Sequence, residues 1–179
     1  DSINFDASII NTRNIDLKNN SLQYFDFQLL SQLINIKSLN LSQNRFENLT
    51  YSNFSFNSGL FYLNLSHNLI KSISDEFFYN FLNLKILDLS FNNLIKLSEK
   101  NFNRLISLEV LNIRKNSLEF LSSKIFLNTK RLIKIDLSQN YLKYIQNETF
   151  YELFYAENIN LSYNILDSIQ YHLFRDTIN

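Results

Sequence analysis

The sequence repeats itself every 24 residues, and this period constrains the fold more than any other feature. A short pattern that ends in asparagine recurs without insertion or deletion, and its asparagines are Asn20, Asn44, Asn68, Asn92, Asn116, Asn140 and Asn164. An aliphatic residue precedes each asparagine by five positions and another by three, as Leu87 and Leu89 precede Asn92. A fixed period of this length is typical of a protein that stacks one small structural unit many times.

The period divides the chain into seven repeats. Their bounds are 12–35, 36–59, 60–83, 84–107, 108–131, 132–155 and 156–179. We number the positions of every repeat from one to twenty-four, so that the asparagine stands at position nine. Residues 1–11 are interpreted as the remnant of a preceding repeat or as a partial cap. The chain starts at Asp1 and contains no methionine, so we expect it to be a processed product or a piece of a longer protein.

The aliphatic residues at positions four and six predict one short strand per repeat. Alternation with a period of two points Leu87 and Leu89 inward and leaves Asp88 and Ser90 facing solvent. One repeat cannot bury its apolar side alone, so seven strands are expected to stack in parallel around one elongated core. The second half of each repeat returns as a loop or short helical turn. The residue at position nineteen, usually phenylalanine, fills the space between the two sides, and the sheet face is predicted to be concave.

The asparagine at position nine is predicted to have a structural role. It stands where the strand ends and backbone amides and carbonyls lose their strand partners. Its side chain carries both donors and an acceptor, so stacked copies form a ladder that satisfies those groups. Each group left unpaired would cost about 1–3 kcal/mol.

The composition raises a question about how the chain turns. It contains no proline, and Gly59 is the only glycine. We therefore expect broad, repeated bends, held by the asparagine ladder and the phenylalanines, instead of tight turns.

Charge and cysteine content exclude several functional classes. Seventeen basic residues balance seventeen acidic ones, which removes the electrostatic case for nucleic acid or an anionic membrane surface. The absence of cysteine excludes disulfides, thiolate metal sites and a cysteine nucleophile, and a single glycine excludes glycine-rich phosphate loops. No apolar run is long enough to cross a membrane. We expect no cofactor and no metal.

The candidates for catalysis are equally few. The two histidines, His67 and His172, stand four repeats apart, about 20 Å in a stacked sheet. A triad of Ser66, His67 and Asp88 fails because about 10 Å of strand separates the histidine from the aspartate. We predict that the chain is not an enzyme, with no catalytic residue and no small-molecule substrate.

The outer face of the sheet is the candidate binding surface. Apolar residues cluster there in the middle repeats and extend toward the C-terminal end: Phe61, Tyr62, Ile86, Phe91, Val110, Ile133, Tyr141 and Tyr163. An exposed apolar patch of this kind marks a contact with a protein partner. The alternative is that these residues are ordinary half-exposed side chains packed against their neighbours.

Glycosylation signals bear on the compartment. Acceptor triplets N-x-S/T begin at Asn19, Asn40, Asn48, Asn53, Asn64, Asn147 and Asn160. Asn48, Asn53 and Asn147 lie in the returning segments and are the better predicted acceptors, because the strand positions would place sugars on the binding face.

The repeat resembles the leucine-rich repeat in its typical 24-residue form. The pattern LxxLxLxxNxLxxLxxxxFxxLxx fits the copy LKILDLSFNNLIKLSEKNFNRLIS at 84–107 at nearly every position, and the resemblance covers residues 12–179. It implies an α/β solenoid, a leucine-rich repeat horseshoe with a parallel concave β-sheet and a convex side of loops and short helices. It also implies an extracellular or cell-surface protein. The cysteine-rich caps common in extracellular members are absent from these residues.

The resemblance leaves three functions open. The chain is similar to chaoptin-type adhesion proteins of arthropods, which contact a like protein on a neighbouring cell. It is also similar to Toll-type receptor ectodomains, which bind protein ligands or pathogen products. The regular array favours adhesion slightly, and an intracellular scaffold is the third alternative. In the first two cases the membrane is reached only through parts of the parent protein that lie outside these residues.

Overall fold

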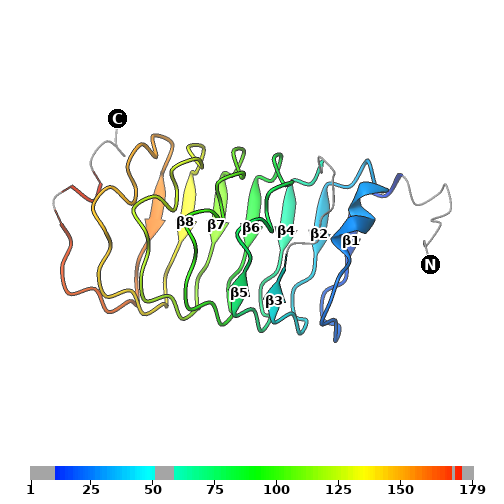
Figure 1. Ribbon diagram of the computed structural model, residues 1–179, viewed down its shortest axis with the longest axis horizontal. Coiled ribbons are helices and arrows are strands. Elements are labelled where there is room, and N and C mark those ends of the chain that lie inside the picture. Colours follow the sequence, from blue (N-terminus) through cyan, green and yellow to red (C-terminus); the bar gives the residue numbers. More distant parts are fainter. Residues whose placement is uncertain (1–10, 51–58, 171, 175–179) are drawn as a thin grey trace.

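A computed structural model describes residues 11–50, 59–170 and 172–174. These residues wind into one elongated solenoid, in which each turn lies beside the next from the blue end to the red end (Figure 1). Its strands are β1 (Asn14–Asp16), β2 (Ser38–Asn40), β3 (Asn48–Leu49), β4 (Tyr62–Asn64), β5 (Ser72–Ile73), β6 (Ile86–Asp88), β7 (Val110–Asn112), β8 (Lys134–Asp136) and β9 (Asn158–Asn160), and a 3-10 helix, η2, spans Phe27–Ser31. Among the described residues, no helix has the length and apolar character that a membrane crossing requires.

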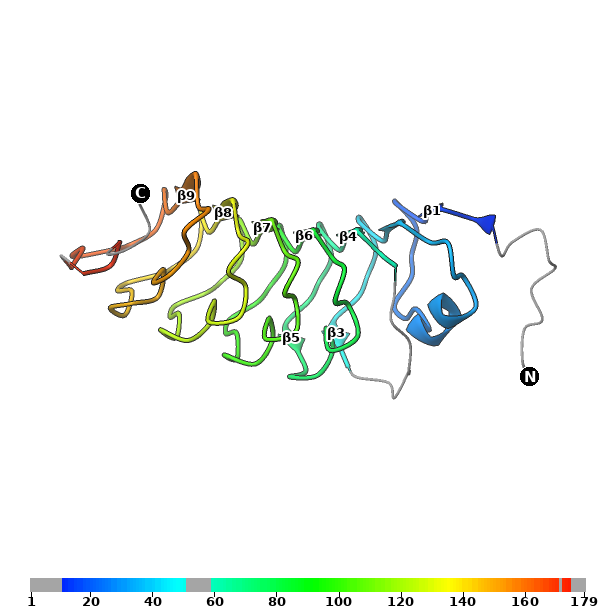
Figure 2. The same ribbon diagram turned by 90° about the horizontal axis from the view of Figure 1, so that it is seen from above.

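Seven strands form one parallel sheet in the order β1-β2-β4-β6-β7-β8-β9. Each residue pairs with the residue 24 positions later, as Leu63 pairs with Leu87 and Leu87 with Leu111. Figure 2 shows the line of strands bending gently, with the returns on the convex side and the other face of the sheet on the concave side. The predicted parallel sheet and leucine-rich repeat solenoid are confirmed.

The strands form because alternate side chains reach a common core. Leu87 and Leu89 have no exposed surface, whereas the preceding Ile86, which points to the other face of the sheet, is 38% exposed. Parallel strands each need a long return to the same end of the sheet, and the 24-residue period supplies it. The sequence pattern and the sheet register therefore have the same cause.

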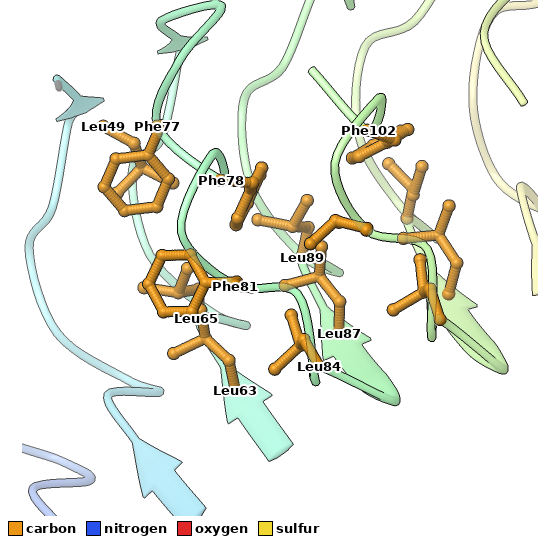
Figure 3. Close-up of a cluster of buried hydrophobic side chains, with 14 of the residues drawn as sticks. Leu49, Leu63, Leu65, Phe77, Phe78, Phe81, Leu84, Leu87, Leu89 and Phe102 are labelled. Atoms are coloured by element: carbon orange, nitrogen blue, oxygen red, sulfur yellow. The ribbon is translucent and has the colours of Figure 1, made fainter. Parts of the chain in front are cut away.

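Phenylalanines at position nineteen fill the space between the sheet and the returns. Phe78, Phe102, Phe126 and Phe150 are all buried. Their rings follow one another along the solenoid, with centroids 6.4 Å apart from Phe102 to Phe126 and 5.9 Å apart from Phe126 to Phe150. Figure 3 shows Phe78 and Phe102 among the leucines that point inward from the strands.

The returns are mostly irregular. In the first repeat, Asp26 caps η2 by accepting a hydrogen bond from the backbone N–H of Gln28. The strands β3 and β5 form a second, two-stranded parallel sheet on the return side, which the sequence pattern did not predict.

The expectation of broad bends is wrong at one point of every repeat. Position eight is a left-handed residue each time, with φ between 53° and 57°, at Asn19, Gln43, His67, Phe91, Lys115, Gln139 and Tyr163. For a residue other than glycine this conformation costs about 1–2 kcal/mol. The chain therefore does turn sharply, without glycine, and other interactions must offset the strain.

The side chain at position five supplies one of those interactions. Asp88 Oδ1 accepts a hydrogen bond from the Ser90 N–H at 2.8 Å, and Asn64 Oδ1 accepts one from the Ser66 N–H at 2.9 Å. The same contact forms in all seven repeats. Every repeat has either aspartate or asparagine at this position, and both offer the oxygen that the turn requires.

Position nine supplies the others. The Asn92 amide donates to the Leu65 and Leu89 carbonyls, each at 3.0 Å, and its Oδ1 accepts the Ile70 N–H at 3.0 Å. Each such side chain therefore joins its own turn to the preceding repeat. The equivalent contacts recur at Asn44, Asn68, Asn116, Asn140 and Asn164.

Candidate functional site

The face of the sheet that points away from the core is the concave side of the solenoid (Figure 2). It carries a compact apolar cluster, which we call the concave patch: Phe61, Tyr62, Ile86 and Val110. Tyr62, Ile86 and Val110 occupy position three of neighbouring strands and are paired in register in the sheet. Phe61 is 42% exposed and Ile86 is 38% exposed, while Tyr62 and Val110 are half-buried. The Tyr62 hydroxyl accepts a hydrogen bond from the Asn64 amide at 3.1 Å, which holds the ring in place.

Two lysines flank the Phe61 ring. The Lys37 Nζ lies 5.2 Å and the Lys85 Nζ 5.8 Å from its centroid, which are favourable cation–π distances. Lys85 also pairs with Glu109 at 2.7 Å. One edge of the concave patch is therefore charged, and only part of that charge is neutralised locally.

Phe91 belongs to a different surface, the line of position-eight turns. Its ring stacks on the His67 imidazole with centroids 4.1 Å apart, and the Lys115 Nζ lies 4.9 Å from the same ring. The Arg114 guanidinium lies 5.9 Å from that ring and donates to Gln139. Phe91 is thus half-covered by its neighbours and adds less open apolar surface than the sequence suggested.

The remaining predicted residues lie apart from the concave patch. Ile133 lines a shallow depression with Glu109, Arg131 and Tyr155. Tyr141 lines another depression beyond the turns, together with Lys71, Asn93, Ile95, Ser117 and Glu119. Tyr163 is 79% exposed on the last turn.

The sequence pattern did not predict which side chains lie beside Phe61 and Ile133. It did not identify Lys37 and Lys85 beside Phe61, or Arg131 and Tyr155 beside Ile133. All four stand at positions two or twenty-four, just before the strand, where the chain enters the sheet. The pattern of positions two and twenty-four along the repeats could have identified them.

The predicted glycosylation sites have open surroundings where they are described. Asn48 is exposed on β3 and its Oδ1 accepts a hydrogen bond from the Ser72 hydroxyl at 2.7 Å. Asn147 is also exposed. Asn53 lies outside the described residues.

The described residues contain no group of three or more histidine, cysteine, aspartate or glutamate side chains that could hold a metal ion. Asp88, which a triad would require beside His67, instead accepts hydrogen bonds from the Ser90 N–H and hydroxyl at 2.8 and 2.6 Å. His67 stacks on Phe91. The polar groups that sequence reasoning weighed for catalysis serve the turns.

Comparison with known families agrees with the geometry. The family model described as "Leucine rich repeat" matches residues 34–94, 58–118 and 106–166. This chain belongs to the leucine-rich repeat family. A comparison with curated protein sequences found no significant match.

Among solved structures, this chain is similar to a chain in a structure described as the crystal structure of a TLR13–ssRNA13 complex. The TM-score is 0.84 and the sequence identity 29%, over 92% of this chain and 23% of that chain. The chain thus spans about a quarter of its structural neighbour. The fold and the resemblance to a Toll-like receptor ectodomain are confirmed, and such folds are typically binding modules without enzymatic activity.

Proposed function

We propose that this chain is a protein-binding module of an extracellular or cell-surface leucine-rich repeat protein, and that it binds its partner through the concave patch. The observation that carries this proposal is the register of Tyr62, Ile86 and Val110 on three adjacent strands. A sheet holds these side chains at fixed backbone positions, which limits the ordering cost of binding, and apolar residues at the centre of a surface are where binding energy concentrates.

Two roles fit such a module. In a receptor ectodomain the concave patch captures a ligand, and the similarity to the Toll-like receptor structure supports this role. In an adhesion protein it contacts a like protein on a neighbouring cell, and the uninterrupted 24-residue array supports that role. Glycans on Asn48 and Asn147 accompany either role, since both side chains are exposed outside the main sheet.

The test is a screen of displayed extracellular proteins, this chain included, with the tetramerised wild-type chain. Every hit is measured again with Ile86→Asp and with the matched control Ile106→Asp, because Ile106 is also exposed, at 52%, but lies outside the main sheet. We expect binding to fall at least tenfold for Ile86→Asp and to stay unchanged for Ile106→Asp. Hits that bind all three proteins equally would contradict the proposal.

A single-stranded RNA belongs in the same experiment, because the structural neighbour was solved with one. The net charge of this chain is zero, and nucleic-acid binding rests on an excess of basic groups. We therefore expect an oligouridylate to bind weakly at physiological salt. Tight binding that Ile86→Asp leaves intact would replace the proposed protein partner with a nucleic acid.

A further inference from the structure

The charges on the outer face of the sheet are unevenly distributed. Positions two, three, five and seven of the repeats, which precede the left-handed turn, carry six cations, and half of these belong to the first two repeats. The same positions carry five carboxylates, Asp16, Asp88, Glu109, Asp136 and Glu157. In a chain with no net charge, this face has an excess of positive charge.

The excess is greatest over the first two repeats. Arg13, Lys18 and Lys37 lie there, all exposed, and we call them the basic end. Asp16 is the one carboxylate at the same positions of these repeats, and its Oδ1 accepts the Lys18 N–H at 2.9 Å. Within the described residues the ion pairs involve Lys71, Lys85, Lys100 and Lys130, so no member of the basic end has an ionic partner there.

The other acidic residues of the first two repeats, Asp26 and Glu47, lie in the returns. Glu47 pairs with Lys71 at 2.9 Å. Asp26 caps η2. Among the described residues of these two repeats, only Asp16 therefore offsets the positive field of the basic end on that face.

The basic end is continuous with the concave patch. The residues at position two form a row in which each backbone N–H bonds the carbonyl of the residue 24 positions earlier: Lys37 to Arg13 at 2.7 Å, Phe61 to Lys37 at 2.8 Å and Lys85 to Phe61 at 2.8 Å. Lys37 also reaches over the Phe61 ring. One ligand can thus contact the cations and the apolar side chains together.

We propose that the partner presents an acidic segment whose carboxylates lie over the basic end and whose following apolar residues lie over the concave patch. This inference rests on the proposed function and specifies the chemistry of the partner. Four strand spacings separate the repeat of Arg13 from the repeat of Val110, about 19 Å, which an extended segment of about six residues spans. Complementary charge sets the orientation of the segment, while the apolar contacts supply most of the affinity.

A nucleic acid fits this surface less well than an acidic polypeptide. A phosphate backbone needs cations along its whole path, but Asp88 and Asp136 stand at position five in the middle of the sheet. Lys85, the next cation after the basic end, is already paired with Glu109. The basic end lies at one end of the sheet, which suits a short run of carboxylates.

The test uses two capped hexapeptides and titration calorimetry. The acidic peptide has three glutamates followed by two leucines and a valine, and the basic peptide has three lysines in place of the glutamates. We expect the wild-type chain to bind the acidic peptide at least tenfold more tightly than the basic one, with an affinity that falls as salt is raised.

Paired variants assign the effect to the basic end. Arg13→Glu with Lys37→Glu should weaken binding of the acidic peptide about tenfold, and Arg13→Gln with Lys37→Gln should weaken it less. Lys96→Glu with Lys124→Glu makes the same change in net charge at exposed positions of the returns, and it should leave binding unchanged. Equal effects of the two glutamate pairs would overturn the inference.

The remaining outcomes separate the two proposals. If both peptides bind equally and Ile86→Asp abolishes both, the acidic partner is wrong while the concave patch remains the site. If Ile86→Asp does not weaken binding of the acidic peptide, the concave patch is not the binding site and the proposed function is wrong. If an oligouridylate with three phosphates binds more tightly than the acidic peptide and requires Arg13 and Lys37, the partner is a nucleic acid and the inference is overturned.

Discussion

The inner repeats and the terminal repeats have the same sequence pattern but different degrees of burial. Leu63 and Leu87 are fully buried at position four, whereas Ile15 and Ile159 at the two ends of the sheet are only half-buried. Asn92 is 7% exposed, while Asn20 in the first repeat is an exposed residue. A repeat is thus stabilised by its neighbours on both sides, and a terminal repeat has only half of that stabilisation within the described residues.

Truncation of the phenylalanines at position nineteen should give the largest difference in stability between the inner and the terminal repeats. Phe102 is fully buried between Phe78 and Phe126, with centroid distances of 6.2 and 6.4 Å. Phe102→Ala should lower the free energy of unfolding by about 3–5 kcal/mol. Phe174→Ala should cost clearly less, because that ring is 39% exposed. Urea denaturation of both variants measures the difference, and equal losses would contradict it.

The asparagines at position nine should show the same difference on a smaller scale. Asn92→Ala leaves the Ile70 N–H and the Leu65 and Leu89 carbonyls without this partner in a buried turn. We expect a loss of about 1–3 kcal/mol and a lower melting temperature. Asn20→Ala should have little effect, since its contacts are exposed. An unchanged melting temperature for Asn92→Ala would show that the ladder does not stabilise the turn.

Substitution at position eight should change the stability least. Gln43 is exposed and left-handed, with φ of 56°. Gln43→Gly removes the steric strain of that conformation but increases the entropy of the unfolded chain, so we expect a net change within about 1 kcal/mol. Thermal denaturation measures it. A large destabilisation would mean that the Gln43 side chain makes a contribution that its exposed position does not suggest.

The sequence was sufficient to predict the main sheet because its signal is periodic. Aliphatic residues at positions four and six recur seven times, and one structural solution, a parallel stack, buries them. The pair β3–β5 was not predictable in the same way, because the aliphatic residue that Leu49 and Ile73 supply at position fourteen recurs in the later repeats, at Leu97, Leu121 and Ile145, where no strand forms. The left-handed turns were missed because their residues have no common side-chain type, so backbone geometry alone defines them.

The candidate site was only partly predictable for a related reason. Strand register places Tyr62 beside Ile86 and Val110, and register follows from the period. The lysines beside Phe61 and the stacking of His67 on Phe91 depend on side-chain conformations that a pattern does not specify. Tyr141 was grouped with the sheet face, although the turn before it directs it to a separate depression.

Amide hydrogen exchange, resolved repeat by repeat, tests the central claim most directly. If each repeat is stabilised by the neighbours on both sides, protection should be highest in β6 and β7 and should fall toward β1 and β9, where the core residues Ile15 and Ile159 are half-buried. Uniform protection across all seven strands would contradict this account.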